Sequence, residues 1–114
     1  MKKIRLIFGI IIIILAAGFS GCATELYSWQ SFETQIYEYL KGESPGKQID
    51  ALEKDRARIE AAGKSIPPGF YAHLGMLYAE AGDDYNAIAC FEAEKTLFPE
   101  AAGFMGILLA RYGK

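Results

Sequence analysis

The sequence predicts an all-α protein: a domain of five short helices that follows an N-terminal leader. Beyond residue 26, apolar residues recur every three or four positions, which is the period of a helix with one buried face. Glycine, proline and serine interrupt this pattern around residues 42–46, 63–69, 82 and 99, where helices would end and begin. No segment shows the strict alternation of a β-strand.

Residues 1–21 have the composition of a secretory signal peptide. Lys2, Lys3 and Arg5 precede an apolar run over residues 6–19, and small residues follow it. Because a membrane-spanning helix needs about 20 apolar residues, this run is too short for a permanent anchor. We therefore expect residues 1–21 to be cleaved from the mature protein.

Cys22 comes directly after this leader and predicts a lipid attachment site. Ser20-Gly21-Cys22 resembles the lipobox of bacterial lipoproteins, in which the cysteine is diacylated and becomes the first mature residue. Phe19 departs from the leucine that is usual three positions before the cysteine. Ala23, in place of aspartate, implies the outer membrane, with the protein on its periplasmic face.

The predicted organisation is thus a leader over residues 1–21, a lipidated tether over 22–25 and a helical domain over 26–114. The only cofactor expected is the covalent lipid on Cys22. Loss of the leader removes three basic and no acidic residues, so the formal net charge falls from −2 to −5. An acidic domain argues against nucleic acid or an anionic membrane surface as a partner.

Two helices are expected before the centre of the domain, over residues 28–41 and 47–62. The apolar stripe of the first is Trp29, Phe32, Ile36 and Leu40. With Tyr37 and Tyr39 beside it, this stripe is either core or an exposed aromatic surface. The second has Ile49, Leu52 and Ile59 inside, and we expect these charged side chains to be solvated: Glu53, Lys54, Asp55, Arg56, Arg58 and Glu60.

Residues 65–99 predict a helix, a turn and a second helix. Gly82 is placed to end the first helix and Asp83 to cap the second. Gly75 leaves room for the second helix to approach closely. The spacing resembles that of a tetratricopeptide (TPR) repeat at these positions: Tyr71, Leu74, Gly75, Tyr78, Gly82, Ala87, Phe91 and Pro99.

The match to this repeat has departures. Tyr85 lies one position later than the aromatic residue that usually precedes the second helix, and Glu94 replaces a small residue. No second copy occurs in the chain, and one repeat cannot bury its own faces. We therefore expect the flanking helices to complete the core of a TPR-like domain.

A last helix is predicted from residue 99 to about 112. Its apolar residues exceed one narrow stripe, so it is either a cap on the core or a docking surface for a partner. Within the repeat, Cys90 is expected to be a buried, unreactive thiol. A shallow partner-binding groove is predicted on the first repeat helix, lined by Ala72, His73, Met76 and Glu80.

No catalytic or metal-binding motif is recognisable. His73 is the single histidine, and no carboxylate or cysteine stands at ligand spacing from it. We expect no enzymatic activity. The alternative, a small hydrolase, would need a pocket that gathers His73, Glu80 and a tyrosine.

Three segments together resemble one family: LYSW with the aromatic-rich helix after it, PPGFYAHLGMLYAEAGD, and FEAEKTLFPEAAGFM. They resemble small lipoproteins that share a domain of unknown function and are commonly encoded beside a lipoprotein similar to the curli secretion channel. Gln30 stands where that family has a glycine. The resemblance implies a protein-interaction adaptor in a secretion or transport complex, with other envelope lipoproteins as partners, including that channel-like protein. The alternative is a regulator of cell-wall synthesis enzymes.

Overall fold

The computed structural model describes residues 1–17 and 25–114, with side chains described for residues 1–12 and 25–114. Cys22, the predicted lipid attachment site, lies outside the described residues, as does most of the tether. α1 (Lys2–Ala17) covers most of the predicted leader. Within the described residues, no helix is long and apolar enough to cross a membrane.

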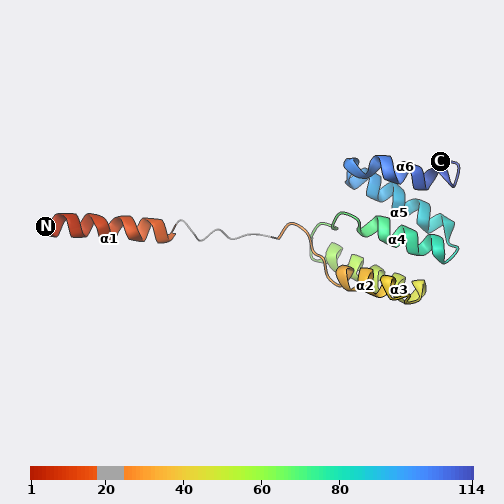
Figure 1. Ribbon diagram of the computed structural model, residues 1–114, viewed down its shortest axis with the longest axis horizontal. Helices are drawn as coiled ribbons and strands as arrows, with labels where there is room; N and C mark the ends of the chain where they lie inside the picture. Colours follow the sequence, from red (N-terminus) through yellow and green to blue (C-terminus); the bar gives the residue numbers. More distant parts are fainter. Residues whose placement is uncertain (18–24) are drawn as a thin grey trace.

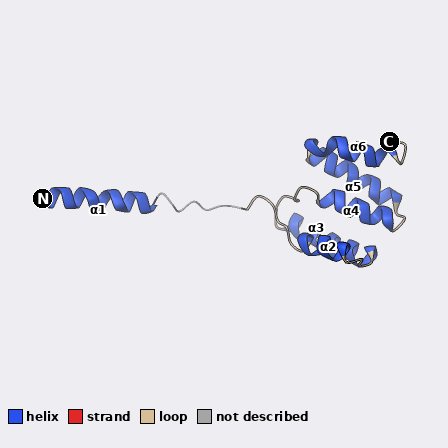
Figure 2. Cartoon of the chain, viewed as in Figure 1, coloured by secondary structure: helices blue, strands red, loops and turns tan. Residues whose placement is uncertain are grey.

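The predicted all-α domain of five helices is confirmed (Figures 1 and 2). Each helix packs against the next one along the chain, and the described residues contain no strand beyond an isolated bridge between Tyr27 and Ser65. The helices are α2 (Phe32–Leu40), α3 (Pro45–Ala61), α4 (Phe70–Glu80), α5 (Asp84–Leu97) and α6 (Ala102–Ala110), and the 3-10 helix η1 (Pro99–Ala101) precedes α6.

α4 and α5 form the helical hairpin at the centre of the domain. Gly82 ends the first helix with a left-handed φ of 81°, which costs glycine little. Asp83 caps the second, accepting a hydrogen bond from the backbone N–H of Asn86 at 3.1 Å. A Cβ on Gly75 would lie 2.6 Å from Cε1 of Phe91, so only glycine permits this close approach of the two helices.

Two apolar clusters lie on either side of α4. One joins α4 to α2 and α3 through Phe32, Leu52, Ile59, Phe70, Leu74, Leu77 and Cys90. The other joins α5 to α6 through Ala87, Phe91, Met105 and Leu109. The flanking helices therefore complete the core around the hairpin, as the sequence predicts.

α2 begins four residues later than predicted. Gln30 has a left-handed φ of 44°, so the chain turns there before the helix starts at Phe32. Phe32 is buried, whereas Trp29 stacks on it with the ring centroids 5.9 Å apart and stays partly exposed. The aromatic stripe is thus divided between core and surface.

Two acidic residues are buried, and one of them, Asp55, was expected to be solvated. Asp55 on α3 accepts hydrogen bonds from the backbone N–H and the hydroxyl of Ser31, the residue before α2. Glu94 on α5 accepts from the backbone N–H groups of Gly69, at 2.6 Å, and Ala72, at 3.3 Å, at the start of α4. Each carboxylate therefore accepts hydrogen bonds at the start of a helix other than its own, where backbone N–H groups have no partner within the helix.

Candidate binding surfaces

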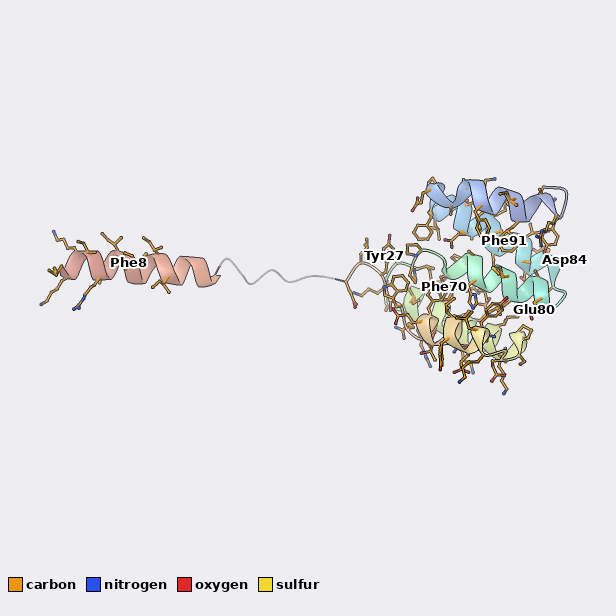
Figure 3. All side chains as sticks on the ribbon, viewed as in Figure 1. Phe8, Tyr27, Phe70, Glu80, Asp84 and Phe91 are labelled. Atoms are coloured by element: carbon orange, nitrogen blue, oxygen red, sulfur yellow. The ribbon has the colours of Figure 1, made fainter. Side chains whose placement is uncertain are left out.

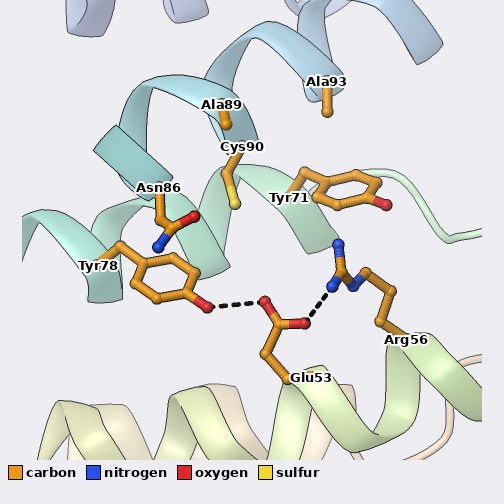
Figure 4. A pocket seen from close by; sticks show the side chains of 8 residues that line it. All are labelled: Glu53, Arg56, Tyr71, Tyr78, Asn86, Ala89, Cys90 and Ala93. Carbon is orange, nitrogen blue, oxygen red and sulfur yellow. Dashed lines mark hydrogen bonds and ion pairs between the residues drawn. The ribbon is translucent and has the colours of Figure 1, made fainter. Parts of the chain in front are cut away.

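A cleft of about 430 Å³ lies between α3 and α5, with α4 as its floor (Figure 4). α3 contributes Glu53 and Arg56, and α4 contributes Tyr71 and Tyr78. The wall on α5 is made of smaller side chains: Asn86, Ala89, Cys90 and Ala93.

The polar groups of this cleft bind one another. The Tyr78 hydroxyl donates to Oε1 of Glu53 at 2.8 Å, and Nη2 of Arg56 contacts Oε2 of the same carboxylate at 2.6 Å. Burial and the Glu53 carboxylate both raise the pKa of Tyr78, so its proton stays in place. The pair of opposite charges leaves the cleft neutral.

Cys90 contributes the thiol of this cleft. Its side chain is buried and makes no disulfide bond. Burial, with a smaller effect from Glu53, raises the pKa of the thiol to about 12, whereas a nucleophilic cysteine needs a lowered pKa. The prediction that Cys90 is buried is confirmed.

The prediction that His73 lines an open groove is wrong. α2 covers this side chain, which contacts the rings of Tyr39, at 5.2 Å between centroids, and Phe32, at 6.0 Å. Its Nε2 has no hydrogen-bond partner among the described residues. Burial lowers the pKa of His73, so the ring is neutral.

The other three residues of the predicted groove, Ala72, Met76 and Glu80, do not share one surface with His73. Ala72 packs against the α5–α6 cluster, and Glu80 is exposed at the end of α4. Met76 is half exposed beside α6, in a cleft of about 110 Å³ that also includes Ala79, Leu108 and Tyr112. Neither this cleft nor the larger one contains His73 or Glu80, so they do not form the pocket that a hydrolase would need.

α6 has one buried face and one exposed face. Met105 and Leu109 pack into the cluster with α5, while Phe104 and Ile107 on the other side are 57% and 65% exposed. The two interpretations of this helix are therefore compatible: it caps the core with one face and leaves an apolar face open. Sequence periodicity alone did not show which residues belonged to which face.

No group of three or more acidic, histidine or cysteine side chains is placed to hold a metal ion in the parts of the chain that the structure describes. The candidate binding surfaces are therefore the neutral polar cleft between α3 and α5 and the exposed apolar face of α6.

Comparisons with known proteins confirm one part of the resemblance, the domain of unknown function. A family model for a domain of unknown function (DUF4810) matches residues 26–108, which is most of the chain. No curated protein matches the chain, and no solved structure does. The match begins at the residue where the helical domain was predicted to begin. The chain belongs to the DUF4810 family, a domain of unknown function.

Proposed function

We propose that this protein is a lipid-anchored adaptor on the periplasmic face of the outer membrane, and that it holds a partner protein against the apolar face of α6. The anchor is the lipid on Cys22, after cleavage of residues 1–21. The observation that carries the adaptor function is the exposure of Phe104 and Ile107 on a helix whose other face is fully packed.

The fold supports a binding function. In this proposal α4 and α5 are a degenerate TPR-like repeat, and TPR-like repeats act as interaction scaffolds. The contact of Gly75 with Phe91 agrees with the spacing that suggested the repeat. The absence of a second copy leaves α6 as the open end of a helical stack, where a further helix would add to it.

The chemistry of the α6 face favours an apolar helix as the occupant. Residues 102–110 include no charged side chain. Next to Phe104 and Ile107 lie Gly103 and Gly106, and a Cβ on either glycine would meet nothing within 4 Å. Small residues beside large ones let a second helix approach closely, as Gly75 does between α4 and α5.

The resemblance suggests the identity of the partner: another envelope lipoprotein, of which the neighbour similar to the curli secretion channel is the first candidate. The neutral α3–α5 cleft supports binding in preference to catalysis, because its carboxylate is paired and its thiol stays protonated. We therefore assign the protein no enzymatic activity.

Affinity purification from detergent-solubilised membranes tests this function. The tagged full chain is compared with a Phe104→Ser/Ile107→Ser variant and with a Cys22→Ser variant. The matched control is Leu40→Ser/Tyr85→Ser, which also removes two well-exposed large apolar side chains but from α2 and α5.

We expect one envelope protein to copurify with the wild type and with the control, and to be lost from the α6 variant. The Cys22→Ser variant should leave the membrane and recover little of that partner. Equal recovery of the partner with the α6 variant and the control would overturn the proposed docking face.

A further inference from the structure

The end of the domain where the chain enters from the tether carries exposed apolar side chains. Leu26, Trp29 and Leu97 are 65%, 38% and 52% exposed. Tyr27 lies among them, with its ring centroid 6.4 Å from that of Trp29 and 6.3 Å from that of Phe98. Tyr27, Leu97 and Phe98 line a cleft of about 360 Å³ together with Lys64, Ser65 and Ile66. We call Leu26, Tyr27, Trp29, Lys64 and Leu97 the entry face.

The position of the entry face relative to the chain is fixed by contacts. Nζ of Lys64 donates to the backbone carbonyl of Glu25 at 3.2 Å, and the N–H of Ser28 donates to the carbonyl of Ser65 at 3.3 Å. Residues 25–28 are therefore held against the loop between α3 and α4. Glu25, the last residue of the predicted tether, therefore lies at this face.

The opposite end of the domain has a different character. The helices run between two ends, so that α2, α4 and α6 begin at the end where α3 and α5 finish (Figure 1). Tyr27 lies at the entry end, whereas Glu80 and Asp84 lie at the far end (Figure 3). The turn from α4 to α5 at that far end carries Glu80, Asp83 and Asp84 with no basic residue. Lys41 follows α2 and Arg111 and Lys114 follow α6 at the same end. One end is therefore apolar and aromatic, and the other carries charges of both signs.

We propose that the entry face rests on the lipid bilayer, with Trp29 and Tyr27 among the headgroups and Leu26 and Leu97 at the top of the acyl chains. This inference rests on the proposed lipid at Cys22. Glu25 is the third residue after Cys22, and an extended chain gains about 3.5 Å per residue, so Glu25 lies within about 10 Å of the anchored cysteine. That reach is comparable to the thickness of the headgroup layer.

The side chains of the entry face suit this environment. Tryptophan and tyrosine favour the membrane–water interface because their rings are apolar with one polar group. Lys64 can reach a lipid phosphate with its amino group. Glu25 and Glu100 are acidic groups at the same end, so apolar and aromatic contacts, and not net charge, provide the attraction. The charged far end would point away from the membrane.

Trp29 is the single tryptophan of the chain and reports directly on this face. The purified full-length lipoprotein is reconstituted into phosphatidylcholine vesicles whose acyl chains carry bromine atoms, which quench a nearby indole ring. A side chain of an interfacial protein enters the boundary between headgroups and acyl chains by about 5–10 Å. Bromines near the top of the acyl chains would then lie beside Trp29, and we expect them to reduce its fluorescence by about half. Bromines near the methyl ends should quench less.

Two variants test whether the entry face is responsible. Leu26→Ser/Leu97→Ser should weaken the quenching by bromolipid and increase quenching by aqueous iodide. Leu40→Ser/Tyr85→Ser, which removes two exposed apolar side chains from α2 and α5, should leave both unchanged. Quenching of Trp29 by iodide and not by bromolipid in the wild type would overturn the proposal.

The mass of the N-terminal peptide shows whether Cys22 carries the lipid. This result distinguishes failure of the entry-face proposal from failure of the proposed function. A lipidated Cys22 without bromolipid quenching would overturn the entry-face proposal alone and leave the anchored adaptor standing. An unmodified Cys22 would overturn both.

Discussion

Glu94 stabilises a helix that lies 25 residues earlier in the chain. Its buried carboxylate accepts hydrogen bonds from the N–H groups of Gly69 and Ala72, which have no partner within α4. The repeat pattern favours a small residue at this position, and the structure gives the physical reason for the exception. A carboxylate here replaces the side-chain cap that Gly69, the residue before α4, cannot supply.

Replacing Glu94 with alanine should lower the free energy of unfolding by about 2 kcal/mol, because two buried N–H groups lose a charged acceptor. Glu94→Gln keeps an acceptor of the same size and should cost about half as much. Glu92→Ala, on the exposed side of α5, is the control and should change stability by less than about 0.5 kcal/mol. Urea unfolding measures all three. Equal stability of Glu94→Ala and Glu92→Ala would contradict the capping role.

His73 should make the domain less stable in mild acid. Burial lowers its pKa in the folded state, so the unfolded chain binds the proton more readily, and stability is lost as pH falls below the unfolded pKa of about 6.5. One pH unit below that value the loss is at most about 1.4 kcal/mol. Urea unfolding between pH 7.5 and 5.5 measures it. His73→Leu removes the single histidine and should abolish this slope; an unchanged slope would mean that another group causes it.

Gln30 adopts a backbone conformation that glycine adopts at lower cost. Its φ of 44° is left-handed, which costs a residue with a Cβ about 1 kcal/mol. Gln30→Gly should therefore raise the free energy of unfolding by about 0.5–1 kcal/mol, even though it removes the exposed hydrogen bond to Ser28. Thermal unfolding measures the change. A lower melting temperature for the glycine variant would show that the side chain of Gln30 matters more than its backbone strain.

The sequence did not reveal the interactions between residues that lie far apart in the chain. Local signals such as Gly82 and the Asp83 cap were predicted correctly, because their partners are neighbours in the chain. The roles of Asp55 and Glu94 depend on N–H groups 24 and 25 residues away. The burial of His73 depends on where α2 packs. Helical periodicity does not carry that information.

The α4–α5 hairpin depends on one close approach at the scale of helices. Gly75 faces Phe91 and Cys90 of the second helix at distances that leave no room for a methyl group. The apolar spacing of residues 65–99 predicted both helices, and the small residue at position 75 predicted their contact. The start of α2 was predicted less well, because Trp29 continues the apolar spacing although the backbone at Gln30 is not helical.

Gly75→Ala should lower the free energy of unfolding by about 1–3 kcal/mol, since Phe91 must move to admit the new Cβ. Gly106→Ala is the matched control within α6, where a Cβ meets nothing within 4 Å. It should be neutral or stabilise the domain by about 0.5–1 kcal/mol, because alanine favours the helix. Denaturant unfolding compares the two. Equal effects would show that α4 and α5 are not as tightly packed as the structure indicates.

For the whole molecule, the proposals assign different surfaces to different tasks. The entry face lies on the membrane, the charged far end points into the periplasm, and the outer face of α6 is left for a partner. The sequence suggested the anchor through Ser20-Gly21-Cys22, but the division between surfaces required knowing which side of each helix is buried. Phe104 and Met105 are neighbours in sequence, yet the first is exposed on α6 and the second is buried.

The central claim is that α6 docks a partner in the cell envelope, and photocrosslinking in intact cells tests it most directly. A photoreactive phenylalanine analogue replaces Phe104 in one strain and Tyr85, which is exposed on α5, in another. We predict that irradiation links the protein at position 104, and not at position 85, to one envelope protein, and that Cys22→Ser reduces this product. Absence of a crosslink at position 104, or the same product from both positions, would contradict the account.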